Sequence, residues 1–160
     1  MVLRRYRFIR AACSAALALL LVPASDALAQ QIGLSNTRGL DFGRFVAGAG
    51  GTVILTPAGL RSRTGGVVLL NSPTVGQARF NASRINGNKT AVIISLPPNG
   101  NIRLLSGTNS MAVNTFVSSP ASTMSIQTPM TLSVGATLTV APNQAPGNYT
   151  GTFSVTVNYQ

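Results

Sequence analysis

From Leu132 to Val140 every second residue is apolar, and the residues between them are serine, threonine and glycine. This two-residue period is the period of a β-strand that has one face buried and the other face in water. A second series of the same period begins at Tyr149 and continues to Tyr159, the last-but-one residue. Amphipathic helices need apolar residues three and four positions apart. The pattern therefore predicts two strands at the C-terminal end of the chain.

The rest of the chain beyond residue 30 has the same character. Short runs of valine, isoleucine, threonine, phenylalanine and tyrosine alternate with turn residues, and no window of a dozen residues keeps a helical period. Many short strands separated by turns are typical of an antiparallel β-sandwich or barrel. We therefore predict an all-β fold, in the form of a β-sandwich. The predicted strands are Leu40–Val46, Thr52–Thr56, Gly66–Leu70, Gln77–Ser83, Thr90–Leu96, Ile102–Leu105, Met111–Val117, Thr131–Val140 and Tyr149–Tyr159.

The N-terminus has the organisation of an export signal. Four arginines precede an apolar run from Ala15 to Val22, and Ala27-Leu28-Ala29 then supplies the small residues of a cleavage site. The apolar run is too short to span a membrane, which takes about 20 residues. We expect residues 1–29 to be a signal peptide that is cleaved before Gln30, which leaves no membrane span. The protein would then be in the periplasm, at the cell surface or outside the cell.

Cleavage would leave a domain that is poor in reactive side chains. The signal contains the single cysteine, Cys13, so no disulfide can form in the mature chain. The mature chain also has no histidine, no glutamate and one aspartate, Asp41. These residues cannot supply a general acid/base pair or an ordinary metal site. We predict no catalytic, metal or cofactor site and no enzymatic activity, and we expect Asp41 to bond nearby backbone or an arginine.

Positive charge is the other feature of the composition. Removing residues 1–29 removes four of the twelve basic residues and one of the two acidic ones, which leaves a net charge of +7. The remaining basic residues are scattered, and no nucleic-acid-binding motif accompanies them. The charge therefore favours solubility and attraction to an anionic cell envelope over nucleic-acid binding.

Two segments, residues 40–43 (Leu-Asp-Phe-Gly) and 147–159, carry a family resemblance. Together they resemble domain-of-unknown-function family 4402, which is similar to spore coat protein U and to chaperone–usher pilins. The resemblance implies an immunoglobulin-like sandwich over residues 40–160 that lacks its final strand. Pilins share a penultimate tyrosine and a glycine fourteenth from the end, which match Tyr159 and Gly147. The cysteine pair of many pilins is absent.

The resemblance also implies a way of assembly. A strand carrying Phe153, Val155, Val157 and Tyr159 would be offered to a periplasmic chaperone, an outer-membrane usher and like subunits. Residues 30–39 would be an N-terminal segment in which Ile32 and Leu34 form a candidate donor strand. The protein would then be a structural subunit of a fimbrium or surface coat. The alternative is a self-contained module that completes its own sheet and binds polysaccharide, lipopolysaccharide or another protein through loops and arginines.

Overall fold

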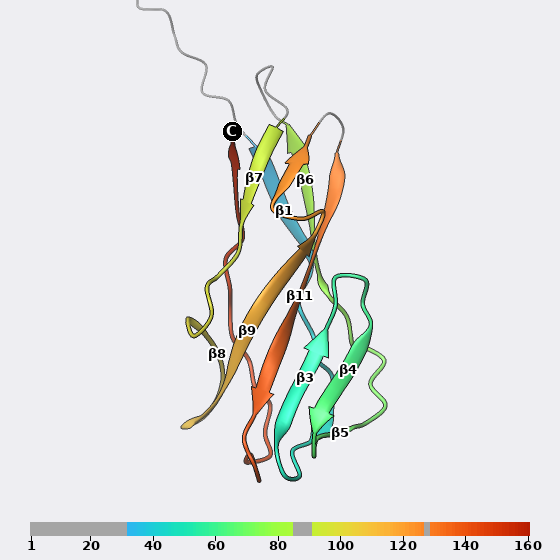
Figure 1. Ribbon diagram of the computed structural model, residues 1–160, viewed down its shortest axis with the longest axis vertical. Coiled ribbons are helices and arrows are strands. Elements are labelled where there is room, and N and C mark those ends of the chain that lie inside the picture. Colours follow the sequence, from blue (N-terminus) through green and yellow to red (C-terminus); the bar gives the residue numbers. More distant parts are fainter. Residues whose placement is uncertain (1–31, 85–90, 127–128) are drawn as a thin grey trace, which may run out of the picture.

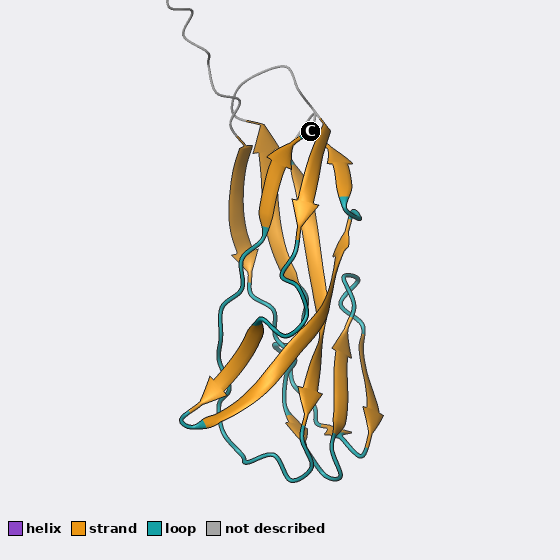
Figure 2. Cartoon of the chain, turned by 60° about the vertical axis from the view of Figure 1, so that its left-hand side comes forward, coloured by secondary structure: helices purple, strands orange, loops and turns teal. Residues whose placement is uncertain are grey.

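The computed structural model describes residues 32–84, 91–126 and 129–160 (Figure 1). The predicted signal peptide and its cleavage site lie outside these residues. All regular structure within them is β-strand, which confirms the predicted all-β class (Figure 2). The described part of the chain contains no helix long and apolar enough to cross a membrane.

The sheet is organised around β11 (Met130–Val140), the strand with the clearest alternation in the sequence. Along one edge of β11, residues 130–134 pair with β6 (Ala78–Arg84) and residues 136–140 pair with β3 (Gly51–Leu55). Its other edge pairs with β9 (Asn109–Ser119). Every pairing is antiparallel, and the apolar residues of β11 are buried. The alternation therefore marks the centre of the fold.

Further strands extend this sheet and cover it. β4 lies beside β3, β8 beside β9 and β1 beside β6, while β7 lies between β10 and β12, and β2 and β5 form a short ribbon. The bounds of these strands are Ile32–Arg38 (β1), Phe45–Val46 (β2), Arg61–Gly65 (β4), Val68–Leu69 (β5), Ala91–Ser95 (β7), Ile102–Ser106 (β8), Thr123–Ser125 (β10) and Thr156–Tyr159 (β12).

The core consists of two clusters along the long axis of the molecule. In the upper half of Figure 1, Val92 and Ile94 of β7 pack against β6 and β11. In the lower half, apolar residues of β3, β9 and β11 pack against the segment that contains Phe42. Phe116 on β9 contacts both clusters, and its ring centroid lies 5.1 Å from that of Phe153. The two layers therefore enclose one continuous apolar interior.

Three predicted strands are clearly shorter in the structure, and one of them, Gly66–Leu70, is reduced to the two residues of β5. Where Leu40–Val46 was expected, Asp41 makes an isolated bridge to Gly76, and only β2 follows as a strand. Gly43 interrupts the strand, because its φ is +71° and its N–H bonds the Asp41 side chain at 2.7 Å. Where Tyr149–Tyr159 was expected, Thr150 bridges to Leu105, and β12 begins at Thr156.

The start of the domain also differs from the prediction. We expected the sandwich to begin at Leu40, but β1 is already a strand of the sheet and pairs with β6. Ile32 and Leu34 are half-buried against the upper cluster. The candidate donor strand therefore completes a sheet of its own chain, and donation to a neighbour would require β1 to leave β6.

Candidate functional site

The described structure contains a groove of 1260 Å³. Its first wall is residues 38–48, which lead from β1 to β2, and its second wall is residues 143–151, which lead from β11 toward β12. Leu104, Met111 and Leu138 form the apolar floor between them. Pockets for small ligands measure about 300–1,000 Å³, so the groove is large enough for a longer occupant.

Each wall is already paired along the edge that faces away from the groove. On the first wall, Asp41 exchanges two backbone hydrogen bonds with Gly76, at 2.9 and 3.0 Å. On the second wall, Thr150 exchanges two with Leu105, at 2.8 and 3.0 Å. Successive residues of an extended chain direct their backbone groups to opposite sides. The residues next to Asp41 and Thr150 therefore direct theirs into the groove.

The N–H groups on this side are unpaired within the described residues, whereas the Phe42 carbonyl accepts a bond from Arg61 Nη1 at 3.0 Å. The N–H groups of Leu40, Phe42, Tyr149 and Gly151 make no hydrogen bond to any other residue that the structure describes. At the lower end of the groove, Asn143 N–H donates to Gly48 O at 3.0 Å and joins the two walls. Almost all backbone groups shielded from water are paired in folded proteins. Both walls of the groove therefore carry N–H groups that water or another strand must satisfy.

Beyond the groove, β1 and β12 are neighbours, and we call the boundary between them the seam. The two strands approach each other, but β1 pairs with β6 and β12 with β7, and neither pairs with the other. Along residues 152–159 the alternation takes the predicted form, since half-buried and exposed residues follow one another in turn. The half-buried residues are the predicted assembly residues Phe153, Val155, Val157 and Tyr159.

The structure brings most of the predicted assembly residues together. Gly147 lines the groove, and the four apolar residues continue from the same wall along the seam. A Cβ on Gly147 would clash with the Ser106 side chain, so the glycine lets the second wall lie close to β8. Ile32 and Leu34 lie on the opposite side, in β1. Asp41 bonds nearby backbone, which is one of its two predicted roles.

Arg61 holds the first wall in place, a role that was not predicted from the sequence. Arg61 on β4 donates from Nη1 to Phe42 O at 3.0 Å and to Arg44 O at 3.3 Å, and from Nη2 to Leu70 O at 2.7 Å. One guanidinium therefore bonds three backbone carbonyls on two segments. A scattered arginine gives no sign of this role in the sequence, because its partners are distant along the chain.

We predict that Arg61→Leu lowers the free energy of unfolding by about 1.5–3 kcal/mol, the usual range for losing hydrogen bonds to a charged group. Arg63 is the matched control, because it lies on the same strand and donates only to the nearby Gly65 O. Arg63→Leu should change stability by less than about 0.5 kcal/mol. Urea unfolding measures both variants. Equal losses would show that Arg61 does not support the wall.

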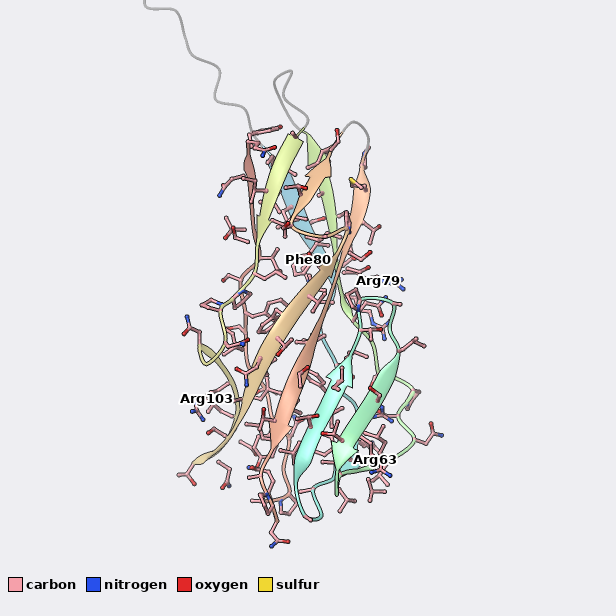
Figure 3. All side chains as sticks on the ribbon, in the orientation of Figure 1. Arg63, Arg79, Phe80 and Arg103 are labelled. Atoms are coloured by element: carbon pink, nitrogen blue, oxygen red, sulfur yellow. The ribbon has the colours of Figure 1, made fainter. Side chains whose placement is uncertain are left out.

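The groove offers shape and hydrogen-bonding groups rather than reactive side chains. Among the described residues, no three histidine, cysteine, aspartate or glutamate side chains lie close enough together to hold a metal ion. Several arginines outside the groove are exposed, and Figure 3 shows Arg63 and Arg79 on one side of the molecule and Arg103 on the other. The positive charge is therefore spread over the surface and does not form one patch.

Comparison with known proteins gives one match. The model of the family described as Domain of unknown function (DUF4402) matches residues 32–159, a span that includes β1, both walls and β12. No curated protein and no solved structure shows significant similarity to the chain.

Proposed function

The chain belongs to the DUF4402 family, and from its groove we propose that it is an exported structural subunit that accepts an extended strand from another chain. The observation that carries the proposal is that both walls have unpaired backbone N–H groups, with an apolar floor between the walls. In β-strand addition, main-chain hydrogen bonds supply affinity and pockets for alternate side chains supply specificity. Repeated addition would build the subunit into a fimbrium or surface coat.

A comparison with another edge strand, β4, supports this proposal. β4 ends the main sheet, and its Arg61 and Arg63 lie opposite Leu55 and Val53, which are buried. Cross-strand neighbours share a face, so both arginines start from the inner face of this edge strand. Arg61 is half-buried there, whereas the side chain of Arg63 is exposed. Inward-pointing charges are a known protection against unwanted strand pairing. The seam has no such protection, since its inward side chains are apolar.

The half-buried seam residues are a second support. Ile32 and Leu34 on β1 pack against the same upper cluster as Val157 and Tyr159 on β12, and all four keep part of their surface in water. Burying one such side chain completely is worth about 1.5–3 kcal/mol relative to leaving it exposed. A strand laid in the seam would gain part of this energy at several positions.

The partners that fit this function are like subunits, a periplasmic chaperone and an outer-membrane usher. The resemblance to pilins at Gly147 and Tyr159 supports this set, and the immunoglobulin-like sandwich lacking a strand is the fold that we propose with it. The predicted export signal agrees with assembly in the periplasm and at the cell surface. No enzymatic step is part of the proposed function.

The test is to block the groove without disturbing the fold. Gly39 lines the groove, its φ is not positive, and a Cβ added to it meets no atom within 4 Å. Gly39→Trp should therefore place a bulky side chain at the groove and leave the melting temperature nearly unchanged. Co-expression with the genomic neighbours, followed by cross-linking and size-exclusion chromatography, reports assembly. We expect wild-type protein to form complexes and Gly39→Trp to remain monomeric.

Ser62→Trp is the control, because Ser62 is exposed on β4, away from the groove. It should assemble as wild type does. A wild-type protein that never forms a complex, or a Gly39→Trp variant that assembles normally, would refute the strand-acceptor function.

A second function is favoured by the surface charge. Arg44, Arg63, Arg79 and Arg103 are exposed, and Asp41 is the single acidic residue in the described chain. β1 also completes a sheet of its own chain. A self-contained module that binds anionic polysaccharide or lipopolysaccharide would fit these two features. This second function predicts a stable monomer whose affinity for such a polymer decreases steeply as the salt concentration rises.

A further inference from the structure

We propose that the strand accepted by the groove is acidic and amphipathic, with large apolar side chains facing the floor and carboxylates among the side chains facing outward. This inference rests on the proposed strand-acceptor function and adds the chemistry of the partner. It follows from two independent features of the groove, namely its empty apolar floor and the sign of the charge on its walls.

The floor requires large apolar side chains. Met111 and Leu138 belong to the buried lower cluster, and Leu104 packs against it. Nothing in the described chain fills the 1260 Å³ above these residues. Apolar surface next to an unfilled volume lacks dispersion contacts on that side. Met111 and Leu138 are almost fully buried, so half-buried Leu104 is the floor residue that large apolar side chains of an occupant would cover.

The charged residues of the walls determine which charge on a partner strand would be attracted. The second wall contains no charged residue, whereas the first wall contains Arg38, Arg44 and Asp41. The Asp41 carboxylate already accepts the Gly43 N–H, and the guanidinium of Arg61 lies against the first wall through its bonds to the Phe42 and Arg44 carbonyls. Arg38 Nη2 donates to Thr74 O at 3.0 Å and to Val75 O at 2.7 Å. The first wall therefore has a net positive charge, and within the described residues Arg44 is its one arginine whose guanidinium is not held by backbone carbonyls.

Arg44 is the residue best placed to meet an acidic partner. Its side chain is exposed, and its guanidinium has no hydrogen bond or ion pair within the described residues. A strand paired with the first wall would lie about 4.8 Å from it. This spacing is shorter than the Debye length of about 8 Å at physiological ionic strength. Carboxylates on the outer face of that strand would be attracted, and lysines would be repelled.

The experiment compares synthetic peptides of roughly nine residues, which span about 30 Å at 3.3 Å per residue. Three peptides carry the same leucines and isoleucines at alternate positions, with glutamate, serine or lysine between them, and a fourth scrambles the glutamate peptide. Fluorescence anisotropy measures their binding to the mature protein. With about two charges in range, we expect the glutamate peptide to bind roughly tenfold more tightly than the lysine peptide at low salt. The difference should vanish near 1 M NaCl.

Arg44→Gln should reduce the ratio between the glutamate and lysine peptides about threefold. Arg103→Gln, which removes an exposed arginine that does not line the groove, should leave the ratio unchanged. If the three alternating peptides bind equally, the acidic partner is refuted while the strand-acceptor function stands. If none binds more tightly than the scrambled peptide, the strand-acceptor function is refuted as well.

Discussion

Replacing Gly135 with alanine should lower the free energy of unfolding by about 3 kcal/mol or more. Gly135 is buried in β11, where that strand lies against β9 on one edge and close to residues 55–57 on the other. A Cβ at this position would clash with the Leu55 carbonyl oxygen and would lie 2.6 Å from Thr56 C and 2.8 Å from Pro57 N. These are backbone atoms, which cannot rotate away as a side chain can. Forcing extra volume into a packed core costs about 1–3 kcal/mol, and more where the neighbours are rigid.

Urea unfolding followed by circular dichroism measures this loss. Gly39→Ala is the matched control, because the same methyl group would meet no atom within 4 Å. Its effect should be neutral or a gain of up to about 1 kcal/mol, since alanine restricts the unfolded chain. If Gly135→Ala is as stable as Gly39→Ala, then β11 and residues 55–57 are not packed as closely as the structure indicates.

Gly135 also marks the limit of what the sequence pattern could predict. The alternation of β11 identified the central strand, because burial of one face acts on every second residue. The role of the glycine depends on residues 55–57, which are remote in sequence. β1 was predicted only as a candidate donor strand and not as part of the sandwich, since Asn36 and Arg38 interrupt its alternation after Leu34. An edge strand tolerates such polar residues, because less of it is buried.

The second wall of the candidate site could be predicted from the sequence, and the first wall could not. The second wall and the seam residues from Phe153 to Tyr159 follow from a local period of two. The first wall was expected to be an ordinary strand, but Gly43 breaks it and Arg61 holds it in place. The groove itself exists because Asp41 pairs with Gly76 and Thr150 with Leu105, on the sides that face away from each other. A local pattern does not encode that choice of partners.

The C-terminal strand should be as sensitive as the centre of the sheet. We expect Val157→Asp to lower the free energy of unfolding by about 2–4 kcal/mol. Val157 is half-buried against the upper cluster and lies opposite Ile94 of β7. The substitution removes apolar contact worth about 1 kcal/mol. It also places a carboxylate where its hydration is restricted, which costs a further 1–3 kcal/mol unless a partner is found. Thermal unfolding measures the loss, and co-expression with the genomic neighbours measures assembly.

Asn158→Asp is the matched control, since it adds the same charge to the same strand on the exposed face. It should change stability by less than about 0.5 kcal/mol, because surface substitutions away from packed or paired groups have small effects. It should also leave assembly intact, because residue 158 faces away from the apolar interior along which an added strand would lie. If the two aspartates destabilise equally, the charge itself is responsible and the alternation of the last strand carries no packing energy. If Val157→Asp folds normally and still assembles, the seam is not the surface that receives the partner strand.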